Sequence, residues 1–218
     1  MNPLHSSLNR VIHADCIPLL KTFPSGTVDL VVTDPPYLTQ YKPRDGRRVA
    51  NDNNPEWLQP AFAEIYRVLK PNSYCFSFYG WPQVDRFMGT WKQVGFVPVS
   101  HFAFVKDYPS KEGYAASHHE TAYLLVKGRP LRPKKPLRDV LPWDYTGNIL
   151  VPTQKPVSVI KKLVEAFSKP GDLVLDPFAG SSTTGIAARE CGRNYILIEK
   201  VWECYRIAHH RLTSETLP

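Results

Sequence analysis

The chain of 218 residues is long enough for one well-packed core and lies near the upper limit for a single domain. Hydrophobic residues make up 43% of the sequence and aromatic residues 12%, a composition that excludes an intrinsically disordered protein. Lys and Arg number 27 against 20 Asp and Glu, and the net charge of +7 is compatible with a polyanionic partner. No apolar run approaches the ~18 residues of a membrane span, and the first residues show no apolar signal region. We therefore expect one domain, residues 1–218, in the cytoplasm.

Short apolar runs alternate with amphipathic stretches along the chain, which is the pattern of an α/β domain with a mostly parallel sheet. Seven strands are predicted, at residues 10–13, 28–33, 73–79, 96–105, 121–126, 173–175 and 195–198. Five helices are predicted, at residues 56–69, 82–94, 156–167, 183–190 and 201–212. The first helix is typical, because Trp57, Phe62 and Ile65 share one apolar stripe and a Lys-Pro pair ends it.

Two segments, residues 38–55 and 127–148, are long for connections within a compact domain. Each is interpreted as a functional loop or a disordered one, inserted in the single domain. The second segment holds six Lys and Arg within its first twelve residues, interleaved with prolines that favour an extended backbone.

The first motif with chemical meaning is DPPY, formed by Asp34, Pro35, Pro36 and Tyr37 directly after the strand at 28–33. Two prolines cannot extend a central strand, because each lacks a backbone donor and fixes φ. The motif alone could be a turn. Its other interpretation is an acid, a rigid carbonyl and an aromatic ring held together at the carboxyl end of a parallel sheet, where ligands bind.

A second motif occupies residues 173–199, where an apolar strand leads into Asp176, a turn of small residues and a helix, and a further strand ends in Glu199. Small residues let a ligand approach the backbone, and an acid after the second strand accepts ribose hydroxyl groups. The GxGxxG pattern of pyrophosphate sites is absent. Because Asp176 would repel phosphate and attract an ammonium group, the motif favours S-adenosyl-L-methionine.

DPPY, PTQKP (152–156), DPFAGSSTT (176–184) and IE (198–199), in this order, resemble the β-group of DNA amino-methyltransferases, in which the catalytic motif precedes the cofactor motif. ADC (14–16) and HETAYLLVKG (119–128) extend the resemblance to residues 10–212. It implies a Rossmann-like methyltransferase fold with a mostly parallel, seven-stranded sheet, helices on both faces and a circularly permuted motif order. It also implies a monomer or homodimer in a bacterial or phage-infected cell.

The resemblance implies the residues that bind S-adenosyl-L-methionine. Asp15 would contact its adenine, Glu199 its ribose, and the motifs around Lys155 and Asp176 its methionine part. The full expected set is Asp15, Gln154, Lys155, Pro156, Asp176, Phe178, Gly180, Ser181, Thr183 and Glu199. No metal is implied. Ser182 stands where family members often have Gly, and we expect its side chain to cap the following helix.

The expected reaction is methylation of the N6 amino group of adenine in double-stranded DNA. Asp34 and the carbonyl of Pro35 would accept hydrogen bonds from the amino group, and Tyr37 would stack on a base removed from the duplex. Base readout is expected from residues 38–54, from residues 101–119 or from both, with a short or relaxed target sequence. The expected phosphate contacts are Lys42, Arg44, Arg47, Arg48, Lys127, Arg129, Arg132, Lys134 and Lys135.

Other functions remain open from the sequence. Cytosine-N4 methylation uses the same architecture, and DPPY favours adenine without excluding cytosine. A catalytically silent DNA-binding module is a second alternative, against which the intact DPPY argues. A methyltransferase for RNA or protein amides is a third. Related enzymes belong to restriction-modification systems, bacterial regulators and phages, and by family analogy we expect a stand-alone or phage-borne enzyme.

Overall fold

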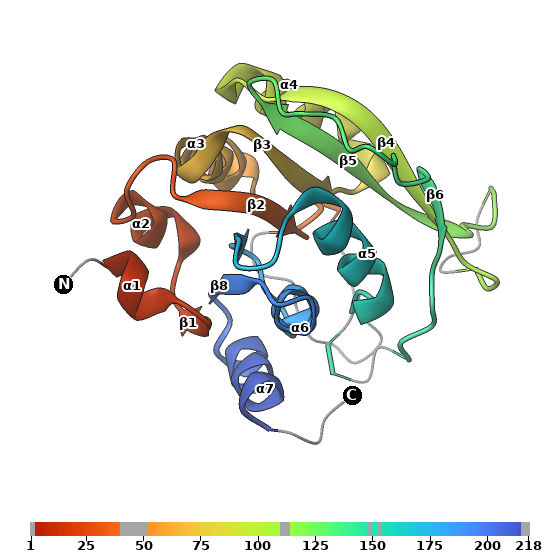
Figure 1. Cartoon of the computed structure of the whole chain (residues 1–218). Coiled ribbons are helices and arrows are strands. Elements are labelled where there is room, and N and C mark those ends of the chain that lie inside the picture. The colour runs from red at the N-terminus through yellow and green to blue at the C-terminus, as the bar shows by residue number, and fades with distance from the viewer. Residues whose placement is uncertain (1–2, 40–51, 110–113, 148–149, 152–153, 215–218) are drawn as a thin grey trace.

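The structure is a computed structural model that describes residues 3–39, 52–109, 114–147, 150–151 and 154–214. These residues form one sheet of eight strands in the order β1-β8-β7-β2-β3-β5-β4-β6, with helices on both faces (Figure 1). The strands are β1 (Arg10–His13), β2 (Val28–Thr33), β3 (Leu69–Phe78), β4 (Val97–Val105), β5 (His119–Lys127), β6 (Val140–Pro142), β7 (Leu173–Asp176) and β8 (Asn194–Glu199). The predicted α/β class with a mostly parallel sheet is confirmed.

Two apolar cores lie between the sheet and its helices. One core joins the sheet to α1, α2, α3 and α4, and the other joins it to α5, α6 and α7. The helices are α1 (Pro3–Ser7), α2 (Cys16–Lys21), α3 (Leu58–Val68), α4 (Val84–Val94), α5 (Val157–Phe167), α6 (Thr183–Glu190) and α7 (Trp202–Thr213), with short 3-10 turns η1 (Pro55–Trp57) and η2 (Trp81–Gln83). No helix among the described residues is both long and apolar enough to cross a membrane.

The sheet differs from the predicted one in having an eighth strand. β6 lies within the 127–148 segment and pairs in parallel with β4, from Ala103 opposite Val140 to Val105 opposite Pro142. Three residues ending in proline are too few to show an alternating pattern, so the sequence could not indicate this strand.

The short helices α1 and α2 were also not predicted. In α2 the side chain of Asp15 accepts a hydrogen bond from the backbone N–H of Ile17 at 2.9 Å, which caps the helix. Pro18, which interrupts the apolar pattern, lies in the first turn, where a missing N–H is tolerated. The other element boundaries shift by a few residues.

Seven strands run in one direction, and β5 alone runs against them. The carboxyl ends of the seven strands and the amino end of β5 therefore lie along one edge of the sheet, which we call the carboxyl edge. β1, β8, β7 and β2 are neighbours, and the residues that follow or end them include Asp15, Glu199, Asp176 and Asp34. The strand order thus gathers the motif acids at this edge.

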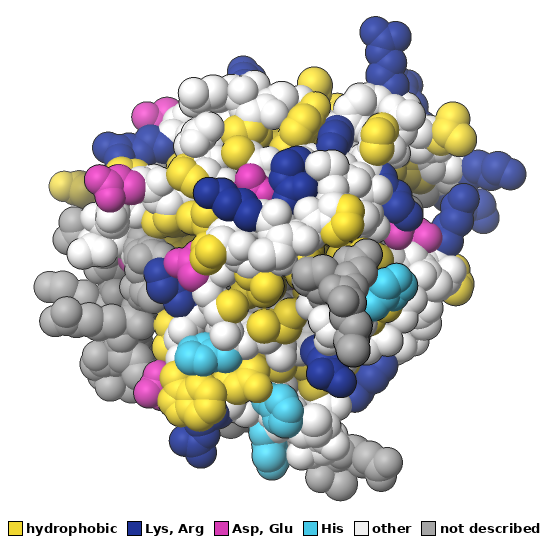
Figure 2. All heavy atoms as spheres, turned by 90° about the vertical axis from the view of Figure 1, so that its left-hand side faces the viewer, with side chains coloured by type: hydrophobic (Ala, Val, Ile, Leu, Met, Phe, Trp, Pro, Cys, Tyr) yellow, Lys and Arg dark blue, Asp and Glu magenta, His cyan; other side chains and the backbone are white. Residues whose placement is uncertain are grey.

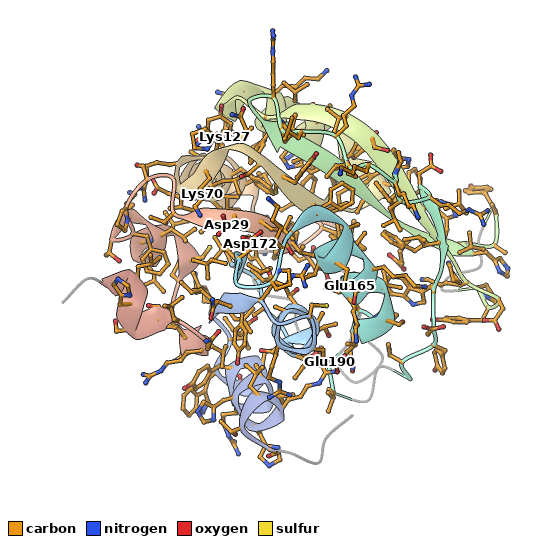
Figure 3. The ribbon with its side chains drawn as sticks, viewed as in Figure 1. Asp29, Lys70, Lys127, Glu165, Asp172 and Glu190 are labelled. Atoms are coloured by element: carbon orange, nitrogen blue, oxygen red, sulfur yellow. The ribbon has the colours of Figure 1, made fainter. Side chains whose placement is uncertain are left out.

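Polar side chains connect the strands at the opposite edge of the sheet. Three of them, Lys127, Lys70 and Asp29, lie one below another in Figure 3. The Lys70 ammonium lies 2.5 Å from Oδ1 of Asp29, whose Oδ2 accepts a hydrogen bond from the N–H of Leu173 at 3.0 Å. Lys127 donates to the carbonyl groups of Tyr66 and Leu69, both at 2.6 Å, at the end of α3. These contacts connect β2, β3 and β7 to one another and connect β5 to the end of α3.

Candidate active site

The DPPY motif leaves the sheet at the end of β2 and places the Asp34 carboxylate between two donors. The Tyr37 hydroxyl donates to Oδ1 at 2.7 Å, and the Lys155 ammonium donates to Oδ2 at 2.5 Å. Burial and the neighbouring carboxylate of Asp34 raise the pKa of Tyr37 well above its ordinary value, so the phenol stays protonated and donates. Each carboxylate oxygen accepts two hydrogen bonds, so Asp34 keeps capacity for a further donor.

Lys155 belongs to residues 154–156, which we call the QKP segment, and it contacts Asp34 of DPPY, 121 residues earlier in the chain. Its side chain is only 7% exposed, against 25% for Asp34. Its ammonium lies 5.4 Å from the ring centroid of Tyr37 and 5.1 Å from that of Phe78, within the range of cation–π interaction. The structure therefore brings two predicted motifs together as one charged and aromatic cluster.

Gly80, which follows β3, is packed against the backbone of DPPY. A Cβ atom at this position would lie 2.7 Å from Cβ of Tyr37 and 3.1 Å from its carbonyl oxygen. A side chain larger than hydrogen would push the motif away from β3. Sequence reasoning missed this residue, because the close approach is between segments far apart in the chain, after β2 and after β3.

Asp176 ends β7 and is buried next to the turn of small residues. Its Oδ2 accepts a hydrogen bond from the Thr184 hydroxyl at 2.7 Å, and its Oδ1 accepts one from the N–H of Phe178 at 3.1 Å. Burial raises the pKa of Asp176 from 3.8 to about 7. A cation placed beside this carboxylate would favour its ionised form, so the site suits a ligand that carries an ammonium group.

Glu199 ends β8 and holds the turn from the other side. Its two carboxylate oxygens accept hydrogen bonds from the N–H groups of Gly180 at 2.8 Å and Val201 at 2.7 Å. Gly180 has φ +52°, and apart from Gly180 itself and its two chain neighbours no described residue has an atom within 4 Å of the position that a Cβ would occupy. The turn therefore presents bare backbone and open space beside two acids, which fits S-adenosyl-L-methionine.

The remaining predicted cofactor residues lie around this turn. Asp15, which caps α2, also forms an ion pair with Lys200 at 2.8 Å. Oε1 of Gln154 accepts a hydrogen bond from the N–H of Leu150 at 3.3 Å, and Pro156 directly precedes α5. Phe178 packs edge to face with Trp57, with ring centroids 5.1 Å apart. Ser181 and Thr183 are buried at the start of α6.

Ser182 does not cap α6 as expected. Its backbone is left-handed, with φ +65° and ψ +30°, and its side chain makes no capping hydrogen bond. Its hydroxyl oxygen is buried and has no hydrogen-bond partner among the described residues. The expectation was wrong because Ser182 lies in the left-handed region, which favours glycine, whereas a capping serine has an extended backbone.

A second buried ion pair at the carboxyl edge was not predicted. Lys106, after β4, donates to Glu120 at the start of β5, and its side chain is 4% exposed. The ammonium lies 5.8 Å from the ring centroid of Tyr108 and 5.5 Å from that of Trp143. The match of HETAYLLVKG to the family was a weak signal for Glu120, but it could not show that Lys106 is its partner.

The predicted DNA contacts divide into three groups. Lys42, Arg44, Arg47 and Arg48 lie outside the described residues. Lys127 pairs with Ser73, five residues before Phe78 at the end of β3, so it lies about 17 Å from the carboxyl edge. The side chains of Arg129, Arg132, Lys134 and Lys135 are exposed on the segment between β5 and β6.

Comparisons with known proteins agree with these motifs. A family model described as DNA methylase matches residues 28–210. YubD of Escherichia coli (strain K12) is 50% identical over 95% of this chain and 91% of its own, and the DNA adenine methyltransferase YhdJ of the same strain is 30% identical over 93% and 82%. The crystal structure of the M1.HpyAVI–SAM complex covers 94% of this chain and 99% of its own, with a TM-score of 0.76 and 26% identity. The cytosine-N4-specific PvuII DNA methyltransferase shares the fold, with a TM-score of 0.76 and 19% identity over 95% of this chain and 87% of its own.

Proposed function

The chain belongs to the DNA methylase family of N6-adenine and N4-cytosine methyltransferases, which use S-adenosyl-L-methionine, and we propose that it methylates N6 of adenine in double-stranded DNA. The observation that carries this proposal is the Asp34 carboxylate, held at the end of β2 by Tyr37 and Lys155. The 30% identity with YhdJ, which is named a DNA adenine methyltransferase, supports the choice of adenine.

The residues of DPPY act on the target amino group. That group is a poor nucleophile, because its lone pair is delocalised into the ring. An acceptor that binds its hydrogen atoms favours a more tetrahedral nitrogen and localises the lone pair. Asp34 has free acceptor capacity for this role, and the carbonyl of Pro35 is the proposed second acceptor. After transfer, Asp34 or water accepts the proton that the nitrogen loses.

Residues around the small-residue turn would hold the cofactor. S-adenosyl-L-methionine, when bound, supplies the methyl group from its sulfonium. Asp176 would face its ammonium group, Glu199 its ribose hydroxyl groups and Asp15 its adenine, as the family motifs imply. The expected set also includes the residues of the QKP segment and the turn, namely Gln154, Lys155, Pro156, Phe178, Gly180, Ser181 and Thr183.

Aromatic side chains at the carboxyl edge suit a base removed from the duplex. Tyr37 is half-buried and offers the stacking surface, since the amino group cannot be reached within a base pair. The pair of Lys106 and Glu120, flanked by Tyr108 and Trp143, borders the same edge. We place the target base in this region, between DPPY and the start of β5.

DNA would contact the exposed basic residues of both long segments. On the face turned to the viewer in Figure 2, Lys and Arg side chains are interspersed with Asp and Glu, so this face offers no continuous basic surface among the described residues. The proposed contacts are Lys42, Arg44, Arg47, Arg48, Arg129, Arg132, Lys134 and Lys135, with Lys127 left out because it binds the end of α3. Binding that uses such contacts weakens as salt rises.

The test is to incubate the protein with unmethylated double-stranded DNA and isotopically labelled S-adenosyl-L-methionine, then digest the DNA and identify the labelled nucleoside by mass. Label in N6-methyladenine is expected, and Asp34→Ala should abolish it while DNA binding persists. Label in N4-methylcytosine would overturn the choice of base and keep the family. In parallel incubations with RNA or protein in place of DNA, label in one of these alone would overturn the choice of polymer.

A further inference from the structure

Arg211 of α7 is a buried cation that the motif-based site does not include. The residue is 2% exposed, and its Nη1 donates to the carbonyl oxygen of Ser181 at 3.1 Å and to Oγ1 of Thr183 at 3.2 Å. Among the described residues its Nε has no hydrogen-bond partner, and no Asp or Glu forms an ion pair with it. Burial lowers the pKa of its guanidinium. Burying a charge in this way is unfavourable, so its contacts to the turn must compensate.

The two contacts of Arg211 lie on either side of Ser182. This residue has φ +65°, a conformation that is strained for any residue except glycine. Its own hydroxyl group gives no support, because it has no partner among the described residues. A strained conformation persists only where its surroundings impose it. Here the guanidinium fixes the residue before it and the residue after it.

Thr183 links Arg211 to the catalytic motif through hydrogen bonds. Its hydroxyl group accepts from Arg211 and donates to the carbonyl oxygen of Lys155 at 3.2 Å. The side chain of Lys155 in turn binds Asp34 at 2.5 Å. An unbroken series of polar contacts therefore runs from α7 through the start of α6 to DPPY.

We propose that Arg211 is a positioning residue that holds Ser182 in its left-handed conformation and so keeps the turn at residues 176–183 in the shape that binds the cofactor. The cofactor part rests on the proposed function of this turn. A glycine at position 182 would adopt this conformation without such support, so the dependence on Arg211 follows from the serine at this position. Without Arg211 the turn would relax, and the cofactor would have to restore its shape on binding.

The experiment measures the Kd of S-adenosyl-L-methionine by titration calorimetry, and thermal unfolding, for the full chain and its variants. Arg211→Met is expected to raise Kd about tenfold, which corresponds to ~1.4 kcal/mol of lost support. The matched control is Arg189→Met, because Nη1 of Arg189 also joins α6 to α7, at 2.9 Å from the carbonyl oxygen of Leu212, without touching the turn. The control should change Kd less than about twofold.

Rescue by glycine separates positioning from a general structural role. In a chain that carries Ser182→Gly, the added Arg211→Met should raise Kd less than about threefold and lower the unfolding midpoint less than in the wild-type background, because glycine adopts φ > 0 without strain. Arg211→Lys, which can reach one of the two acceptors, should give an intermediate Kd. It also provides the comparison if Arg211→Met does not fold.

Two results would overturn the proposal. The first is an equal rise of Kd on Arg211→Met with and without Ser182→Gly. The second is a rise of Kd in Arg189→Met as large as that in Arg211→Met. Either result would show that Arg211 only attaches α7 to the rest of the fold. A wild-type chain that binds no S-adenosyl-L-methionine would instead refute the cofactor role of the turn. The coupling between Arg211 and Ser182 in thermal unfolding would then still decide whether the guanidinium supports the strained residue.

Discussion

The ammonium group of Lys155 lies 2.5 Å from Oδ2 of Asp34, so the acid of DPPY is half of an ion pair whose cation comes from the QKP segment. This contact fixes the side chain of Asp34, since its other oxygen is held by Tyr37 at 2.7 Å. Catalysis by positioning is sensitive to displacements of about 1 Å, so a partner that orients the acid contributes to the rate.

Replacing Lys155 by Met should lower the rate of methyl transfer about 10–100-fold while DNA binding persists, because Asp34 loses one of its two restraints. Single-turnover rates at saturating DNA and cofactor measure the effect. Lys161→Met is the control, since Lys161 pairs with Glu190 on the surface at 3.1 Å. Equal rates in the two variants would contradict the orienting role of Lys155.

Asp176 should make stability depend on pH. Its pKa is raised from 3.8 to about 7 by burial, so the folded protein keeps a proton there that the unfolded chain releases. The contribution of Asp176 to the free energy of unfolding is therefore largest below about pH 4 and falls as the pH rises to about 7. Above that pH the contribution changes no further. Asp176→Asn should flatten this part of the profile of thermal unfolding midpoint against pH. A slope unchanged by the substitution would sink the idea. Glu199, whose pKa burial also raises, leaves part of the slope in both proteins.

The same carboxyl group should make cofactor affinity depend on pH. An ammonium group beside Asp176 favours the ionised form, so S-adenosyl-L-methionine should bind more tightly as pH rises towards about 7. Calorimetric titrations in buffers of different ionisation enthalpy should show proton release below that pH. Binding at pH 6 without proton release would mean that Asp176 does not face the ammonium group.

Gly80→Ala should reduce methyl transfer more than about tenfold, because the new Cβ would lie 2.7 Å from Cβ of Tyr37 and displace DPPY. Gly89→Ala is the matched control. Gly89 lies inside α4, and apart from its chain neighbours and the nearby helix backbone no described residue has an atom within 4 Å of its Cβ position. The substitution should therefore stabilise the protein by about 0.5–1 kcal/mol. Steady-state rates and urea unfolding separate the two effects, and normal activity of Gly80→Ala would show that DPPY can move without loss.

Glu120→Ala should destabilise the protein by about 2–4 kcal/mol, because it leaves the buried ammonium of Lys106 without its carboxylate. The double variant Lys106→Met with Glu120→Leu should recover much of this loss, since it removes both charges and keeps apolar volume beside Tyr108 and Trp143. Urea unfolding measures both. A single variant as stable as wild type would mean that water replaces the carboxylate.

Lys127 and Lys135 should behave in opposite ways. Lys127→Met should lower the free energy of unfolding by about 1–3 kcal/mol, because it leaves carbonyl groups of Tyr66 and Leu69 without a donor, and should keep the salt dependence of DNA binding. Lys135→Met should leave stability unchanged and reduce the slope of log K against log salt by about 1. Unfolding curves and filter binding at several salt concentrations distinguish them, and an unchanged slope in Lys135→Met would remove that residue from the DNA contacts.

The sequence was sufficient for those parts of the site that lie directly after strands. Asp34 and Asp176 follow or end apolar runs, and parallel strands bring their carboxyl ends to one edge, so the motifs alone predict where these acids meet. Helix α6 was predicted with its observed bounds, because a turn of small residues precedes it and Gly192 follows it closely.

The residues that support the site were not predictable, because each acts on a partner far away in the sequence. Gly80 matters through its approach to Tyr37, and Lys106 through Glu120 on the neighbouring strand. Neither residue type signals such a role by itself. Ser182 shows the opposite case, in which propensity favoured a helix cap but the geometry of the turn imposed a left-handed backbone.

The position of Arg211 near the end of the chain affects when it is synthesised and which truncated copies of the gene could be active. The ribosome adds this residue after Asp34, Lys155, Asp176 and Glu199, so a nascent chain carries every motif before it carries the guanidinium that supports the turn. A copy of the gene with a stop codon before α7 would still encode DPPY, QKP and DPFAGSST in the correct order. Such a copy would still be recognised as a methyltransferase from its motifs, although its product would lack α7 and therefore Arg211. The presence of α7 would thus indicate a working product better than the motifs do.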